Sequence, residues 1–153
     1  MVVLFEGPPD EKLLKVIGVS STQNSRHKSG VLKKLVKKEG LIGVVDEDPK
    51  NTQSRPRIMN EFLLLEEKYA IKVYHHQSNN NRLIVLCPDL ENWILSAAKT
   101  SKINVSKFKL PNRAGALHDI INSRLLNFGK LIQELIAEQN ASILYLQSIL
   151  MTK

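Results

Sequence analysis

Short, almost purely apolar runs in the first half of the chain place the strongest limit on its fold. Four of them hold mostly Val, Ile and Leu at consecutive positions: residues 2–5, 41–45, 71–74 and 83–87. A strand that is apolar at every position is typical of a strand buried on both faces. Helical patterns separate these runs, as in βαβ units, so we predict an α/β fold with a mostly parallel sheet of about four strands flanked by helices.

Three helices are predicted between these strands. The first spans residues 10–17 and follows two prolines, and the second spans residues 31–38, with Ser29 as N-cap and Gly40 as the stop signal. The third covers about residues 58–68. Residues 19–28 have the composition of a loop, so any strand there must be short.

The second half of the chain shows only helical periodicity. Its last predicted helix carries apolar residues at helical spacing from position 131 to 146, with Asn140 as a kink. We therefore predict one domain over residues 1–153, made of an α/β core (1–90) and a helical extension (91–153). The helical extension packs on the sheet or forms a homodimer surface, and the sequence leaves both alternatives open.

Composition narrows the class of protein. No run approaches the roughly 18 apolar residues of a membrane helix. The start of the chain has no basic leader, and Cys87 has no second cysteine to pair with. We expect a soluble, cytoplasmic protein. The net charge of +7, from 22 basic and 15 acidic residues, favours anionic partners such as nucleic acid.

Acidic residues follow two of the predicted strands. Glu6 comes directly after residues 2–5, and Asp46 and Asp48 come after residues 41–45. We expect Pro49 to keep Asp48 extended, so that both aspartates project to the same side. Mg²⁺ or Mn²⁺ commonly binds one or two carboxylates and completes its shell with water and phosphate. These three acids and Asp10 are the candidates for such ligands. The structural alternatives are a solvated turn for the aspartate pair and a helix N-terminal acid for Asp10.

Two motifs resemble the halves of a Toprim domain. They are VLFEG at residues 3–7, followed by Asp10, and GVVDED at residues 43–48. The resemblance spans about residues 1–90. It implies that Glu6 acts as an acid or base or as a metal ligand, and that Asp46 and Asp48 hold Mg²⁺ or Mn²⁺ at a phosphodiester.

A third segment is similar to the nuclease branch of that superfamily, the overcoming-lysogenization-defect nucleases. The strand at residues 83–87 is followed by PDLENW at residues 88–93, and the resemblance makes Glu91 a further metal ligand. The structural alternative is a surface acid in a first helical turn. The second strand of the Toprim pattern, near Gln23, has little apolar sequence to support it.

Basic residues complete the candidate site. We predict nucleic-acid contacts from residues in the polar loop and beside the acidic strand ends: Arg26, Lys28, Arg55, Arg57 and Arg82. Four lysines (33, 34, 37 and 38) share one face of their predicted helix, which either tracks phosphates or is simply solvated.

The leading hypothesis is therefore metal-dependent phosphodiester chemistry on nucleic acid, in the manner of a nuclease. The alternative is a non-catalytic Toprim-like module that binds nucleic acid or protein in a defence or processing complex. A haloacid-dehalogenase-like phosphatase also uses an Asp-x-Asp motif after a strand, but that motif follows the first strand, where this chain has Glu6.

Overall fold

The computed structural model describes residues 1–48 and 57–151, and within these ranges the chain forms two compact units. The first, here called the sheet unit, comprises Met1–Gly7 and Ser21–Asp89. The second, the helical unit, comprises Pro8–Ser20 and the chain from Leu90 onward. The first helix, which the sequence assigned to the α/β core, belongs to the helical unit.

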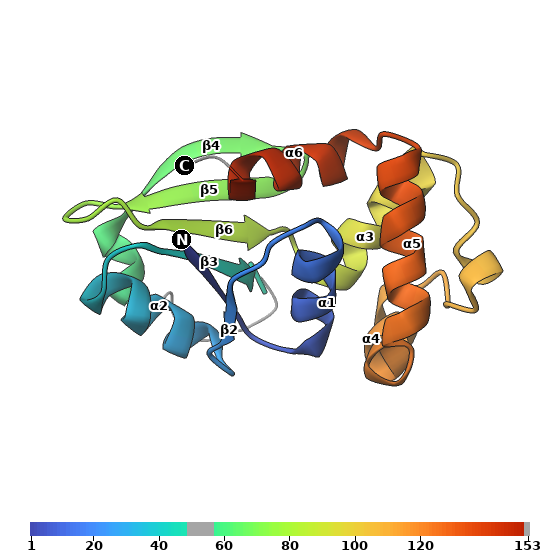
Figure 1. Cartoon of the computed structure of the whole chain (residues 1–153), viewed down its shortest axis with the longest axis horizontal. Helices are drawn as coiled ribbons and strands as arrows, with labels where there is room; N and C mark the ends of the chain where they lie inside the picture. The colour runs from blue at the N-terminus through green and yellow to red at the C-terminus, as the bar shows by residue number, and fades with distance from the viewer. Residues whose placement is uncertain (49–56, 152–153) are drawn as a thin grey trace. The chain divides into compact units, whose positions relative to one another are not determined.

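The sheet unit contains six strands rather than the predicted four (Figure 1). Their order across the sheet is β2-β1-β3-β6-β5-β4. The strands are β1 (Val2–Phe5), β2 (Thr22–Asn24), β3 (Leu41–Asp46), β4 (Phe62–Lys68), β5 (Ile71–His76) and β6 (Arg82–Leu86). The first four in the order run parallel, and β5 and β4 are antiparallel additions at one side. The prediction of a mostly parallel sheet is thus confirmed, and its strand count was too low.

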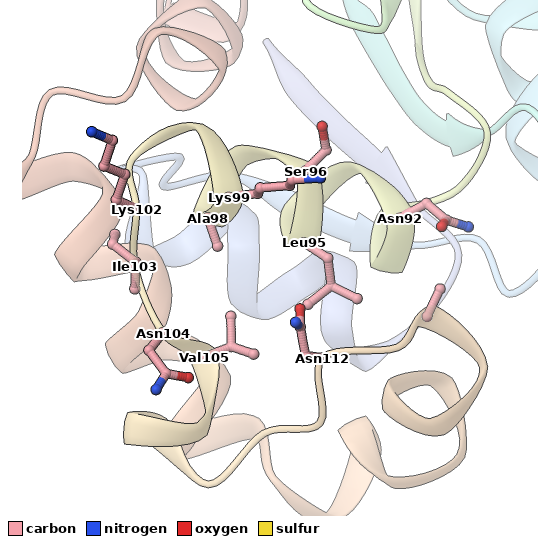
Figure 2. Close-up of a pocket in the computed structure, with 11 residues that line it drawn as sticks. Asn92, Leu95, Ser96, Ala98, Lys99, Lys102, Ile103, Asn104, Val105 and Asn112 are labelled. Carbon is pink, nitrogen blue, oxygen red and sulfur yellow. The ribbon is translucent and has the colours of Figure 1, made fainter.

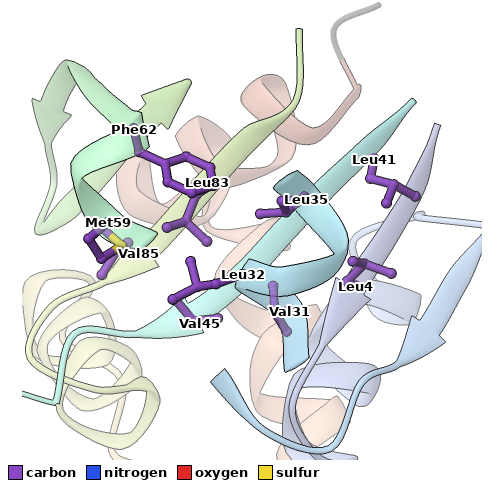
Figure 3. Close-up of a cluster of buried hydrophobic side chains, with 10 residues drawn as sticks. All are labelled: Leu4, Val31, Leu32, Leu35, Leu41, Val45, Met59, Phe62, Leu83 and Val85. Carbon is purple, nitrogen blue, oxygen red and sulfur yellow. The ribbon is translucent and has the colours of Figure 1, made fainter. Parts of the chain in front are cut away.

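One helix, α2 (Lys28–Lys37), packs on the sheet inside this unit together with a short 3₁₀ helix, η1 (Arg57–Glu61). Its buried side chains Val31, Leu32 and Leu35 lie against leucines and valines of β1, β3 and β6 (Figure 3). Gly43 of β3 allows this close contact, because a Cβ atom there would lie 2.5 Å from Cγ1 of Val31. The helix begins at Lys28, so Ser29 lies inside it and is not the predicted N-cap.

The predicted helix at residues 58–68 is wrong. The segment forms η1 and then β4, which pairs with β5. Leu, Glu and Lys favour a helix by intrinsic propensity, but pairing with a neighbouring strand overrides so weak a preference. The turn between β4 and β5 was not predictable from its residues either. Tyr69 and Ala70 both have positive φ, at 54° and 55°, but the sequence lacks the Asn-Gly pair that normally marks such a hairpin.

This turn yields a prediction on stability. A left-handed conformation costs a non-glycine residue about 1 kcal/mol, and glycine adopts it without that cost. We expect Ala70→Gly to raise the free energy of unfolding by about 0.5–1 kcal/mol in urea titrations. The matched control, Ala116→Gly in α4, is expected to lower it by about the same amount. A fall for Ala70→Gly as well would contradict the strained-turn interpretation.

The helical unit consists of α1 (Pro8–Val16), α3 (Leu90–Thr100), α4 (Ala114–Ile120), α5 (Leu125–Ala137) and α6 (Ala141–Met151). Two short 3₁₀ helices, η2 (Val105–Phe108) and η3 (Ile121–Ser123), lie between them in the chain. The helix α1 packs against α5. None of the helices in the described ranges is long and apolar enough to cross a membrane.

Asn140 separates α5 from α6 and is more than a kink in one helix. Its Oδ1 accepts hydrogen bonds from the amides of Ser142 (3.0 Å) and Ile143 (3.2 Å), which caps α6. Its Nδ2 donates to the carbonyl of Ala97 (2.9 Å) and to Oγ of Ser101 (2.7 Å). One buried amide thus starts α6 and joins it to the end of α3.

Candidate functional site

The carboxyl ends of β1 and β3 lie side by side. The two strands are parallel neighbours, with Leu4 opposite Gly43. Glu6 is the first residue after β1, and Asp46 is the last residue of β3. Open α/β sheets bind their ligands outside the carboxyl ends of their strands. We call residues Glu6, Asp46, Glu47 and Asp48 at this position the acidic edge.

Glu6 is held in an unusual setting for a carboxylate. Its Oε1 is shielded from solvent and has no hydrogen-bond partner among the described residues. Burial raises the pKa of Glu6 above its ordinary value of 4.5. The ammonium of Lys28 and the backbone amide of Asp46 lower this pKa, and the charge of Asp48 raises it further. The pKa of Glu6 therefore depends on three neighbours at the same edge of the sheet: Lys28, Asp46 and Asp48.

Two lysines from different elements bind Glu47 of the acidic edge. Lys28, the first residue of α2, donates a hydrogen bond from Nζ to the carbonyl oxygen of Glu47 at 3.1 Å. Lys72 of β5 forms an ion pair with Glu47, with 2.6 Å between Nζ and Oε2. The hydrogen bond from Lys72 is the main reason why the pKa of Glu47 is lowered. Lys72 lies 25 positions from Glu47, so no local sequence signal announced this pair.

Asp48 does not continue the extended strand, as the sequence had led us to expect. Its φ is +54°, in the left-handed region, and its amide donates to the carbonyl of Pro88 at 2.9 Å. The alternation of an extended chain therefore does not apply to Asp46 and Asp48. Asp48 still reaches the neighbourhood of Glu6, because its charge affects the pKa of that residue. Pro49 and Arg55 lie outside the described residues.

Asp10 and Glu91 belong to the helical unit. Asp10 lies in the first turn of α1, which is the position that both of its interpretations assume. Glu91 is buried near the start of α3, and its Oε1 lies 2.9 Å from Nδ1 of the exposed His118. The sequence had placed His118 in no site, and a separation of 27 positions gave no reason to pair it with Glu91.

The predicted phosphate-binding residues are spread over both ends of the sheet. Arg26 lies in the loop after β2, and Lys28 lies at the acidic edge. Arg57 is exposed on η1. Arg82 begins β6 opposite Ile42, four positions along β3 from Asp46, or about 13 Å at the rise of a strand. Arg82 therefore lies at the amino end of the strands and does not flank the acidic edge, contrary to the sequence-based expectation.

Cys87 is a free cysteine that directly follows β6. Burial raises the pKa of its thiol to about 11, and the charge of Glu47 raises it as well. The thiol is protonated at neutral pH, and its Sγ lies 3.7 Å from the carbonyl oxygen of Val85. Burial therefore disfavours the thiolate, which is the nucleophilic form of Cys87.

The acidic edge fits one mode of metal binding and not another. Among residues 1–48 and 57–151, no group of three or more His, Cys, Asp or Glu side chains is arranged to hold a metal ion. An all-protein cage is thus not formed there. Mg²⁺, however, commonly takes one or two carboxylates and completes its shell with water and substrate phosphate. One or two carboxylates drawn from Glu6, with its unpartnered Oε1, and the nearby Asp46 and Asp48 fit that sparse arrangement.

The raised pKa of Glu6 predicts how stability depends on pH. The folded protein holds this proton more tightly than the unfolded chain does, so stability falls as pH rises from about 4.5 through the folded-state pKa. We expect metal-free Glu6→Gln to lack this fall and to be more stable than the wild type at pH 7. Melting temperatures from pH 4 to 8, measured with a chelator, test this. Parallel curves for the two proteins would contradict it.

A pocket of about 710 Å³ lies in the helical unit, between α3 and the segments that follow it (Figure 2). Leu95 and Val105 point into it, and Lys99 and Lys102 stand at its rim. None of its lining residues is acidic, and none belongs to the predicted site. The candidate chemistry therefore remains at the acidic edge.

The fold and the edge together define an α/β protein with a mostly parallel sheet and a group of carboxylates at the carboxyl ends of two central strands. Comparisons of the chain with protein-family models, with curated proteins and with solved structures give no match. The Toprim resemblance stays a prediction that rests on the motifs at residues 3–7 and 43–48.

Proposed function

We propose that the acidic edge carries out divalent-metal-dependent cleavage of phosphodiester bonds in nucleic acid, as the resemblance to Toprim nucleases implies. The observation that carries the proposal is the half-buried Glu6 at a strand end, whose Oε1 is shielded from solvent without a hydrogen-bond partner among the described residues. The backbone amide of Asp46 and the charge of Asp48 both act on its pKa. An unpartnered buried carboxylate oxygen is costly, and ligand sites are where such groups are retained.

Each residue then has a distinct role. Asp46 and Asp48 would hold Mg²⁺ or Mn²⁺, which supplies charge stabilisation for a phosphoryl oxygen. Glu6, whose pKa is raised by burial, holds or releases a proton closer to neutral pH than an ordinary glutamate does. Lys28 places a positive charge beside Glu6, where a phosphate would approach.

The alternative is a non-catalytic module that binds nucleic acid or protein. One observation favours it: the ammonium of Lys28 already compensates part of the Glu6 charge without any metal. In that case Lys28 and the carboxylates form a structural cluster, and the edge binds no divalent ion.

The test is a cleavage assay on single-stranded and double-stranded DNA and RNA with Mg²⁺, Mn²⁺ or a chelator. We expect cleavage of at least one substrate with metal and none with the chelator. Glu6→Gln and Asp46→Asn are expected to be inactive. Glu39→Gln removes an exposed carboxylate just before β3, at the opposite end of the sheet, and is expected to keep activity. Activity that survives Asp46→Asn would overturn the assignment.

A further inference from the structure

A row of lysines covers the solvent side of α2. Val31, Leu32 and Leu35 bury the other side of this helix against the sheet. Lys33, Lys37 and the following Lys38 are exposed. Lys33 and Lys37 are four positions apart and so are neighbours on the helix surface. We call Lys33, Lys37 and Lys38 the α2 lysines.

The α2 lysines form no ion pair with the acidic side chains that the structure describes. Lys15 pairs with Glu11 at 2.9 Å and Lys72 pairs with Glu47 at 2.6 Å, whereas none of the α2 lysines forms an ion pair with a described residue. The helix itself contains no acidic residue. The exposed Glu39 follows Lys38, but residues 28–38 contain no acidic side chain, so the positive charge of the α2 lysines exceeds the nearby negative charge and is available to an anionic partner.

The α2 helix also leads directly to the acidic edge. It starts at Lys28, whose Nζ donates to the carbonyl of Glu47. Its other end is tied to the amino end of β3, because the side chain of Asn81 donates to the carbonyl of Lys38 and accepts from the amide of Leu41. At 1.5 Å per residue, this ten-residue helix spans about 15 Å between the two ends of the sheet.

We propose that the α2 lysines bind the phosphate backbone of a single-stranded nucleic acid and lead it to Glu6, Asp46 and Asp48, a role that rests on the proposed function. Charge complementarity identifies the partner as a polyanion. The length of the row and its continuation through Lys28 to the acidic edge favour an extended strand. Contacts of this kind are independent of base sequence and depend strongly on salt.

The salt dependence gives the expected size of the effect. Each phosphate contact in a single strand contributes about 0.7 to the slope of log K against log salt. Loss of three contacts therefore makes the slope shallower by about 2. If the variant and the wild type bind equally at about 1 M salt, the variant then binds about 100-fold more weakly than the wild type at about 0.1 M salt.

The experiment measures binding of labelled single-stranded DNA and RNA, each about 12 nucleotides long, by fluorescence anisotropy. The salt concentration is varied from about 0.05 to about 0.3 M, a range in which phosphate contacts change affinity strongly. A chelator prevents cleavage. The test variant carries Lys33→Gln, Lys37→Gln and Lys38→Gln. Its matched control carries Lys99→Gln, Lys102→Gln and Lys130→Gln, three exposed lysines of the helical unit, and loses the same net charge. We expect the large loss of affinity and the shallower slope only in the test variant.

Three outcomes would overturn the proposal: equal weakening by both triple variants, salt-independent binding, or binding to anionic lipid vesicles and to no polynucleotide. Circular dichroism confirms that each variant is folded. Failure of the proposed function would look different. If the wild type binds a single strand through the α2 lysines but no substrate is cleaved with Mg²⁺ or Mn²⁺, this inference stands and the nuclease assignment falls.

Discussion

Asp46→Asn is expected to lower metal-dependent cleavage about 100-fold or more and to abolish the thermal stabilisation that Mg²⁺ or Mn²⁺ gives the wild type. A metal that clamps a phosphoryl oxygen contributes several kcal/mol to catalysis, and each 1.4 kcal/mol is about a factor of ten in rate. A ligand that binds only the native state at about 100 times its dissociation constant adds about 2.7 kcal/mol to stability.

Without metal, the same substitution is expected to raise the melting temperature slightly. Glu6, Asp46 and Asp48 are like charges at one edge, and Asp48 already makes ionisation of Glu6 less favourable. Removing one negative charge relieves this repulsion. The measurement is calorimetry of both proteins with chelator and with about 10 mM Mg²⁺, a concentration chosen to exceed a typical weak dissociation constant. A loss of more than about 1 kcal/mol with an intact metal response would identify Asp46 as a structural residue at the end of β3 and not as a metal ligand.

Asn81→Ala is expected to lower the free energy of unfolding by about 3 kcal/mol or more. The fully buried side chain accepts from the amide of Leu41 at 2.8 Å and donates to the carbonyls of Leu35, at 2.7 Å, and Lys38. The carbonyl of Leu35 keeps Nδ2 of Asn79 as a donor at 3.1 Å, so the amide of Leu41 and the carbonyl of Lys38 are the groups that lose this partner. Each buried polar group left without a partner costs about 1–3 kcal/mol. Denaturant unfolding measures the loss, and exposed Asn80→Ala in the same turn is the control, with an expected change below about 0.5 kcal/mol.

Asn81→Asp separates hydrogen bonding from packing. It keeps the shape and the acceptor but turns the donor into a carboxylate oxygen that faces two carbonyl oxygens. We expect it to be at least as destabilising as alanine at pH 7 and to recover partly at acidic pH, where the protonated acid donates again. A loss below about 1 kcal/mol for both variants would show that Asn81 does not hold α2 to the sheet.

Sequence reasoning succeeded where a single element determines its own position. Runs of consecutive apolar residues predicted β1, β3, β5 and β6, and strand ends placed Glu6 and Asp46 at a common edge. It failed where a distant partner decides the outcome. The residues of β4 favour a helix in isolation, and only pairing with β5 makes them a strand. In the same way, Lys72 reaches Glu47 because β5 joins the sheet beside β6.

At the acidic edge, too, the sequence predicted the location of the residues but not their conformation. The location of this edge follows from strand order, but the conformation of Asp48 depends on a hydrogen bond to Pro88, 40 positions away in the chain. The position of Arg82 failed for a simpler reason. Its closeness to an apolar run was clear, but Arg82 precedes that run, and the start of a strand that runs parallel to β3 lies at the amino end. Parallel pairing put Arg82 at the end opposite to Asp46.

The helical unit is discontinuous in sequence, which constrains any dissection of this protein. Its first helix, α1, is inserted directly after β1, whereas its partner α5 comes more than a hundred residues later. A fragment that ends at residue 89 would retain every strand, yet it would carry α1 with the buried side chains Leu13 and Leu14 stripped of α5. Such a fragment would expose an apolar surface prone to aggregation. A minimal version of the sheet unit therefore requires a short loop in place of residues 8–20, not only removal of the C-terminal helices.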